Sequence, residues 1–265
     1  MSKSIAIAAF IIIILAGFIL LGLDILDIAE DFRLDLPIAT INTILISAVA
    51  VPVVYYSTKI FIKSGSAVAL GLSGAVLAFG FSILLYGWLT DTDLNTRITA
   101  YDTGVFFAAV MHSLGAACLL FQRETLISNS TSGRTAVSVI IYLVLLLVIS
   151  LITWLAHEDI ITFIVTPIGA NLYTRDIVQG IAFILCFGSA LVYMRNYFKT
   201  KVDSSFWYSL GLVLFAAGVI FISRGPLESR IAWLGRLSEY TGGIYMLIAA
   251  LGFYRQIGKD NKNTA

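Results

Sequence analysis

The stretch YDTGVFFAAVMHSLGAACLL (residues 101–120) decides the fold class. It is apolar over a length that crosses a bilayer as one helix, since about 20 residues suffice. Similar runs recur along the 265 residues, of which 59% are hydrophobic and 12% charged. A water-soluble domain does not hide so much apolar surface. The sequence therefore predicts an all-α integral membrane protein, because a helix satisfies its own backbone hydrogen bonds inside the lipid.

Eight apolar runs have the length of a membrane span. They lie at residues 5–23, 38–61, 67–89, 101–121, 135–155, 176–194, 206–223 and 233–254. The first is expected to remain as a helix, because it is too long for a signal peptide and lacks a small-residue cleavage pattern. The seventh is the weakest and could form a hairpin with the eighth. We expect eight transmembrane helices joined by short connections.

The basic residues set the expected orientation, because cytoplasmic loops carry an excess of Lys and Arg. With eight spans, one face would hold both termini and eleven basic residues, and the other face six. The first group is Lys3, Lys59, Lys63, Arg123, Arg134, Arg195, Lys199, Lys201, Arg255, Lys259 and Lys262. The distribution predicts a multi-pass protein of the cell membrane with both termini in the cytoplasm.

A faint internal repeat appears at a spacing of about 138–140 residues. Lys63 aligns with Lys201, the Leu-Gly-Leu at 70–72 with that at 210–212, and the Thr-Gly at 103–104 with that at 241–242. The alignment suggests two parallel four-helix repeats, residues 1–127 and 128–255. Parallel repeats occur in transporters as well, so the repeat does not select a function.

His112 stands near the middle of the opening stretch, about 16 Å along the helix from Tyr101 at ~1.5 Å per residue. Its helical neighbours three and four residues away are all small: Ala108, Ala109, Gly115 and Ala116. Small faces are the usual contact surfaces between membrane helices. Three readings remain open for the ring: a hydrogen bond to a neighbouring helix, a place in a ligand pocket, or a haem or metal ligand. The last lacks a second histidine at mid-membrane depth.

The eighth run carries a second set of candidate binding residues. Arg236 and Glu239 lie one helical turn apart near the outer boundary, either as a local ion pair or as the polar mouth of a pocket. That pocket would also include Asp102 and Tyr240. Tyr245 lies deeper on the same helix, beside small residues.

The outer connections contain two acidic stretches. Asp24, Asp27 and Asp31 share one helical face after the first run. A second, outer-face polar cluster is expected from His157, Glu158, Asp159 and Arg175. Neither stretch has the spacing of a known calcium or zinc motif, so we expect no metal site.

The sequence contains no nucleotide-binding loop, no hydrolase or zinc-protease motif and no lysine in the last run for a retinal Schiff base. We therefore expect no enzyme activity, no cofactor and no nucleic-acid partner. The two cysteines, Cys118 and Cys186, lie in apolar runs and are expected to be buried.

Several segments resemble the N-terminal multi-pass membrane sensor region of archaeal and bacterial PAS-containing sensor histidine kinases. The similarity spans roughly residues 60–255 and is carried by PIGANLYTRD, SFWYSLGLVLFAAG and WLGRLSEYTGGIYMLIAAL, with NTRITAYDTGVFFAAVMHSLGA upstream. The resemblance implies signal input without catalysis. The chain has neither the phosphoacceptor region nor the ATP-binding domain of those kinases.

The sequence thus predicts a membrane sensor domain at residues 1–255 and a cytoplasmic tail at 256–265 that leads to an output domain. A small or lipophilic ligand would bind near the fourth and eighth helices and shift the last helix. Expected partners are membrane lipid, that ligand, a signalling domain in cis or in trans, and a second copy in a homodimer. The alternative is a small-solute transporter built from the two repeats.

The expected orientation is testable by cysteine labelling. In a background without Cys118 and Cys186, Lys262→Cys should react with an impermeant thiol reagent only after cells are opened, because the C-terminus is predicted to be cytoplasmic. Labelling of this position from outside intact cells would contradict the orientation.

Overall fold

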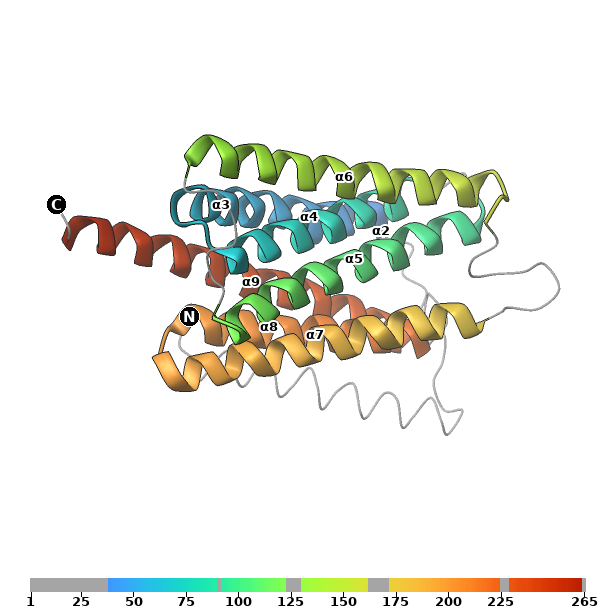
Figure 1. Cartoon of the computed structure of the whole chain (residues 1–265). Helices are drawn as coiled ribbons and strands as arrows, with labels where there is room; N and C mark the ends of the chain where they lie inside the picture. The colour runs from blue at the N-terminus through green and yellow to red at the C-terminus, as the bar shows by residue number, and fades with distance from the viewer. Residues whose placement is uncertain (1–37, 90–91, 123–129, 162–171, 225–228, 264–265) are drawn as a thin grey trace.

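The structure, a computed structural model, describes residues 38–89, 92–122, 130–161, 172–224 and 229–263, and no strand occurs in these ranges (Figure 1). Helix α2, the π-helical turn η1 and helix α3 follow one another without a break, and six long helices come after them. The elements are α2 (Ile38–Asn42), η1 (Thr43–Ser47), α3 (Ala48–Ser64), α4 (Ala67–Trp88), α5 (Leu94–Leu120), α6 (Thr131–His157), α7 (Leu172–Thr200), α8 (Asp203–Arg224) and α9 (Arg230–Asn263).

Six helices in the described ranges are long and apolar enough to cross a membrane. They are Ala39–Ser64, Ala67–Trp88, Leu94–Leu120, Thr131–His157, Arg175–Thr200 and Asp203–Arg224. Large apolar side chains also point outward from the bundle, including Val51 at 68% exposure, Leu147 at 67% and Ile184 at 67%. Lipid is the solvent that tolerates such a surface. The chain is therefore a helical multi-pass membrane protein, as the composition predicts.

The predicted number of eight spans is met only in part. The first predicted span, residues 5–23, lies outside the described residues, as do Asp24, Asp27 and Asp31. The eighth forms helix α9, but α9 is not among the six apolar spans. Its Arg236 and Glu239, together with several tyrosines, lower its mean hydropathy. The helix also continues to Asn263, beyond the boundary expected at residue 255.

Local capping interactions explain where several helices begin. The side chains of Ser66, Asp93, Ser130 and Ser229 accept hydrogen bonds from the amides three residues on, at 3.4, 3.2, 3.1 and 3.2 Å. Such a cap satisfies a backbone donor that the first turn leaves free. At the other end of α3, Gly65 adopts φ 75°, a left-handed conformation that glycine enters without steric cost. The α3–α4 connection is therefore a tight turn.

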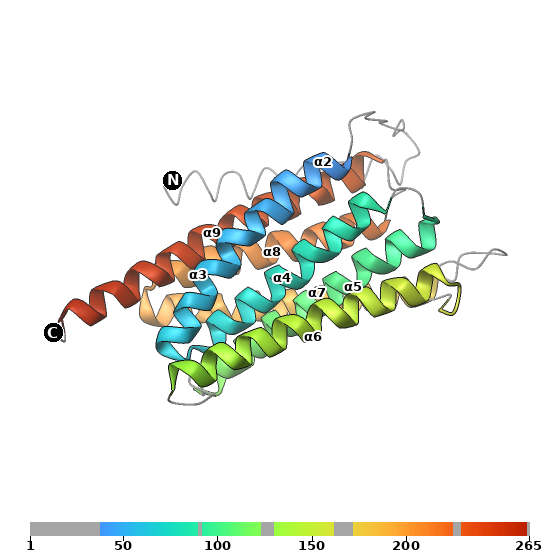
Figure 2. The same cartoon turned by 90° about the horizontal axis from the view of Figure 1, so that it is seen from above.

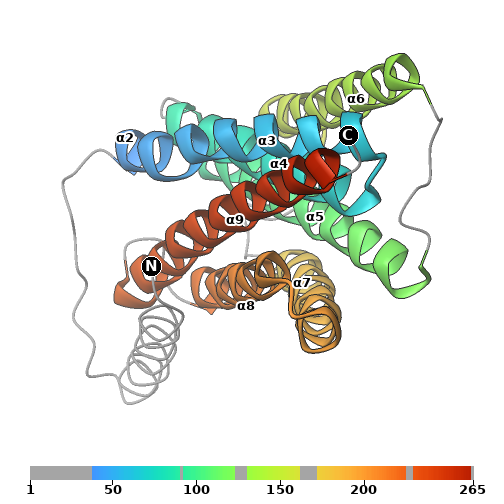
Figure 3. The same ribbon diagram turned by 90° about the vertical axis from the view of Figure 1, so that its left-hand side faces the viewer.

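The helices close into a ring. Neighbours pack in the order α3, α4, α5, α7, α8 and α9, and α9 returns to pack on α3, while α6 lies outside against α3, α4 and α5. Figure 2 shows α6 along one edge of the bundle. Viewed from the end at which α9 leaves, α9 runs obliquely between α3 and α8 (Figure 3). Helices α4 and α8 are buried along most of their length.

Helices α8 and α9 form the hairpin that the sequence suggested, and four glycines bring them together. Gly211 of α8 faces Gly242 of α9. About two helical turns away, Gly218 of α8 faces Gly235 of α9. A Cβ atom at Gly242 would lie 2.9 Å from the carbonyl oxygen of Gly211, and one at Gly218 would lie 2.8 Å from that of Gly235. Glycine at both points therefore allows the two backbones to approach directly.

The two predicted repeats stay a prediction. The aligned residues Gly104 and Gly242 have different neighbours. Gly104 faces Ser82 and the carbonyl oxygen of Ala78 on α4, whereas Gly242 faces Gly211 on α8. In the predicted repeat, Gly211 corresponds to Gly71 of α4. Gly104 contacts α4 at least about two helical turns away from Gly71, at Ala78 and Ser82. In the ring order, the last span of each predicted half packs on the second span of the other, since α5 packs on α7 and α9 on α3.

The glycine contact can be tested at two adjacent positions. Gly242→Ala should destabilise the protein by about 1–3 kcal/mol, because the new methyl group meets the backbone of α8. Gly243→Ala is the matched control, since its Cβ would have only Val49 near it, at 4.0 Å. The control should be neutral or stabilising, as alanine favours the helix. Melting temperatures in detergent that rise equally for both variants would contradict the close approach.

Candidate functional site

Eight buried polar residues from four helices gather near the beginning of α9, and we call this group the polar layer. None of them is more than 8% exposed. The members are Asn42 of α2, Tyr101 and Asp102 of α5, Arg175 and Gln179 of α7, and Arg236, Glu239 and Tyr240 of α9. Ionisable groups at such depth in a membrane protein are costly, and each needs a partner.

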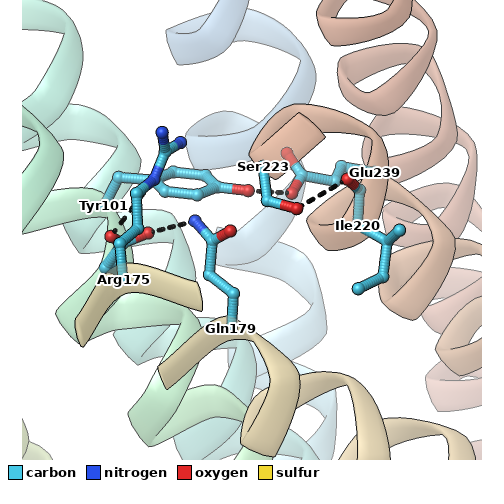
Figure 4. Close-up of polar contacts among 7 residues, drawn as sticks. Tyr101, Arg175, Gln179, Ile220, Ser223 and Glu239 are labelled. Carbon is cyan, nitrogen blue, oxygen red and sulfur yellow. Dashed lines mark hydrogen bonds and ion pairs between the residues drawn. The ribbon is translucent and has the colours of Figure 1, made fainter. Parts of the chain in front are cut away.

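Asp102 is held by two side chains from one face of α7. The amide Nε2 of Gln179 donates a hydrogen bond of 2.6 Å to Oδ1, and Nε of Arg175 lies 3.6 Å from Oδ2. Residues 175 and 179 are four apart, so both side chains project from the same side of the helix. Figure 4 shows Arg175 and Gln179 near each other on α7. A charge pair and a hydrogen bond together reduce the penalty of burying the carboxylate.

Glu239 connects α9 to α5. The hydroxyl of Tyr101 donates a hydrogen bond of 2.6 Å to Oε1, as Figure 4 shows. The other oxygen, Oε2, is buried and has no hydrogen-bond partner among the described residues. A Cβ atom at Gly218 would lie 2.6 Å from Cγ of Glu239, so the side chain fits only because α8 carries glycine there. The guanidinium of Arg236, one turn earlier, lies 4.9 Å from the ring centre of Trp233.

A third bond ties α9 to α2. The hydroxyl of Tyr240 donates to Oδ1 of Asn42 over 2.6 Å. Asn42 immediately precedes the π-helical turn η1, a kind of turn that is frequent at functional sites. Thus α9 is joined to α5 through Glu239 and to α2 through Tyr240, on consecutive residues.

His112 lies deeper and makes an interhelical hydrogen bond. Its Nδ1 is 2.7 Å from the hydroxyl of Tyr208 on α8. The ring of Tyr193 on α7 packs against Tyr208, with ring centres 4.3 Å apart. The groove of small residues around His112 is filled by these tyrosines, since a Cβ atom at Gly115 would lie 3.0 Å from the hydroxyl of Tyr193.

Two small cavities meet at Glu239. One, of about 20 Å³, lies within the polar layer between Tyr101, Arg175 and Arg236. The other, of about 30 Å³, extends from Glu239 to His112. A cavity that size holds about one or two water molecules. These two cavities therefore have room for water beside the unpaired carboxylate oxygen.

The other predicted site residues lie elsewhere. Tyr245 packs edge-on against Trp207, with ring centres 5.4 Å apart, inside the apolar core. His157, Glu158 and Asp159 are exposed at the end of α6. The sequence grouped Arg175 with these three residues. In the structure, Arg175 is instead buried against Asp102. Among the residues that the structure describes, no group of three potential metal ligands lies together.

Sequence reasoning missed four partners: Asn42, Tyr101, Gln179 and Tyr208. Gln179 had a visible signal, because an amide four residues after an arginine in an apolar run shares its helix face. The tyrosines had none, since tyrosine is common both in membrane cores and at membrane interfaces.

Comparisons of the chain with protein-family models, with curated proteins and with solved structures found no match. Any assignment of function therefore depends on the geometry of the chain itself.

The Asp102–Arg175 pair gives a test of the polar layer. Asp102→Asn should destabilise the protein by about 3–5 kcal/mol, because it leaves the buried guanidinium without its counter-charge. The matched control is Asp176→Asn, an exposed residue next to Arg175, which should change the melting temperature little.

The double variant Asp102→Asn/Arg175→Gln should recover part of the loss, because it removes both charges. The pair does not stabilise the fold if Asp102→Asn has the melting temperature of the wild type. The same conclusion follows if the double variant melts no higher than Asp102→Asn.

Proposed function

We propose that this protein is a membrane signal-input domain in which α9 relays a change of packing to an output at its C-terminal end. The observation that carries the proposal is α9 itself, a helix of 34 residues. At ~1.5 Å per residue it is about 51 Å long, well over the thickness of the hydrocarbon core. It begins in the polar layer and extends past the ends of the other helices (Figures 1 and 2).

The contacts of α9 suit a helix that changes position as a unit. Its first half is fixed by specific bonds, from Glu239 to Tyr101 and from Tyr240 to Asn42. Along the same half, its backbone contacts that of α8 directly, at Gly218 and Gly211. Beyond these contacts, Arg255 and Gln256 are exposed. A shift at the polar layer would therefore move the far end, since the helix between them is continuous.

A stimulus needs only a different affinity for two packings of α9 to act as a signal. The unpaired Oε2 of Glu239 is one group whose interactions would differ between such packings. In this proposal the chain has eight spans with both termini in the cytoplasm of a cell membrane, a partner output domain and no catalytic activity of its own.

The test joins a histidine-kinase output to the full chain after Ala265 and measures autophosphorylation in membranes. Tyr101→Phe removes the hydroxyl that binds Glu239, and it should change the output about two- to tenfold. A hydrogen bond contributes about 0.5–1.5 kcal/mol, and 1.4 kcal/mol corresponds to a factor of ten.

The matched control is Tyr142→Phe. Tyr142 of α6 donates to Ser73 over 2.7 Å and bonds Thr58 at 2.5 Å, and neither partner belongs to α9. The control should leave the output unchanged. Equal outputs from the wild type and from Tyr101→Phe would contradict the proposal. Solute uptake by liposomes containing the unfused chain would instead favour the transporter alternative.

A further inference from the structure

A larger cavity lies at the opposite end of the bundle from the polar layer, where α9 leaves it. We call it the exit cavity. Its volume is about 320 Å³, compared with about 20 and 30 Å³ for the two cavities at Glu239. Small-molecule sites usually begin at about 300 Å³. The exit cavity is therefore of ligand size, whereas the space beside the polar layer is of water size.

Six helices contribute to the exit cavity. Its mouth is framed by two tight turns, with Ser64 and Ser66 from the α3–α4 turn and Thr200 and Val202 from the α7–α8 turn. The remaining lining residues are Ile60, Val68, Ala69, Leu119, Tyr193, Asn196, Ser205, Phe253, Gln256 and Ile257. None of the fourteen is charged. The wall thus consists of aliphatic and aromatic groups with several neutral polar ones.

Most of the neutral polar groups already have partners. The amide of Asn196 donates to the hydroxyl of Ser205 over 3.0 Å, and the hydroxyl of Thr200 donates to the carbonyl oxygen of Asn196 over 2.9 Å. Ser66 caps α4. Tyr193 differs from them, because its ring is fully buried and its hydroxyl, which lies beside Tyr208, makes no well-aligned hydrogen bond among the described residues. A buried donor that lacks a well-aligned acceptor is costly, and a ligand oxygen would supply one.

We propose that the exit cavity binds an uncharged, amphipathic small molecule. A hydroxyl or carbonyl oxygen of the ligand accepts a hydrogen bond from Tyr193, and its apolar part packs against Val68, Leu119 and Phe253. A charged ligand is disfavoured, because the lining offers no counter-charge and an unpaired charge is expensive to bury. Arg134 lies against the α3–α4 turn, but its guanidinium bonds the carbonyl oxygens of Ile62 and Lys63. Arg195 and Lys199 line a neighbouring groove that shares Leu119 and Asn196 with the exit cavity.

The position of the cavity gives the ligand a role that rests on the proposed function. Phe253, Gln256 and Ile257 of α9 line the cavity together with residues of α7 and α8. One turn above, Gly252 of α9 packs directly on Ser204 of α8. A ligand between these helices would set the angle at which α9 leaves the bundle. The binding itself does not depend on the signalling proposal.

The binding test uses three probes with the same chain length: 1-decanol, decanoate and decylammonium. Binding to the full chain in lipid nanodiscs is measured by equilibrium dialysis of the labelled probe, with empty nanodiscs subtracted. The neutral alcohol should bind saturably, and the two ions at least about tenfold more weakly. Equal binding of all three probes, or no saturable binding of the alcohol, would overturn the proposal. Preferential binding of decanoate would also overturn it and would point to the Arg195–Lys199 groove.

Two variants locate the binding. Tyr193→Phe keeps the ring but removes the donor, and should weaken 1-decanol binding about 2- to 10-fold. Val202→Trp fills the mouth and should abolish it. The matched control is Tyr55→Phe, which should leave 1-decanol binding unchanged. The hydroxyl of Tyr55 accepts a hydrogen bond from Lys59 on the exposed face of α3, away from the cavity. Wild-type affinity in both cavity variants would overturn the proposal.

The two proposals fail separately. Saturable, Tyr193-dependent binding without any effect of Tyr101→Phe on kinase output would retain the cavity and reject the signalling role. A change of kinase output in Tyr101→Phe without saturable binding of 1-decanol would retain the signalling role and reject the cavity proposal.

Discussion

The close approach of α8 and α9 is the constraint on which the rest of the structure depends. Glycine at 211, 218, 235 and 242 lets the two backbones touch, and only that approach admits the side chain of Glu239 between α8 and α5. A carboxylate in this setting must be partnered, and Tyr101 supplies the bond. The small residues thus determine where the polar layer forms, and the polar layer in turn fixes α9 to the helices around it.

The two ends of α9 have different chemistry. One end lies among paired charges and water-sized cavities, where strong directional bonds select one packing. The other end lies beside a ligand-sized, uncharged cavity and then leaves the bundle. Between them, four glycines bring the backbones of α8 and α9 into contact, and side chains such as Ile222 and Met246 pack beside them. In the proposed signalling role, a shift of α9 would have to occur along this contact.

Hydropathy was sufficient to predict the helices and the membrane, because apolar runs of span length have few alternatives in a folded chain. It also identified Asp102, His112, Arg236, Glu239 and Tyr240 as unusual, since polar groups stand out in apolar runs. Partner choice was not predictable from one sequence. Arg175 was assigned to an outer-face polar cluster with His157, whereas in the structure it pairs with Asp102, a partner that depends on the register between α5 and α7. The glycine pairs of α8 and α9 were visible as residues, but their facing positions depend on the antiparallel arrangement of the two helices.

The central claim is that the polar layer and the far end of α9 move together. Spin labels at Arg255→Cys on α9 and Leu191→Cys on α7, in a background without Cys118 and Cys186, measure that movement by pulsed electron paramagnetic resonance in nanodiscs. Both positions are exposed. Glu239→Gln weakens the bond to Tyr101 without changing side-chain size. The account predicts that this substitution shifts or splits the distance distribution between the labels, while Asp176→Asn leaves it unchanged. Superimposable distributions for the wild type and Glu239→Gln would contradict it.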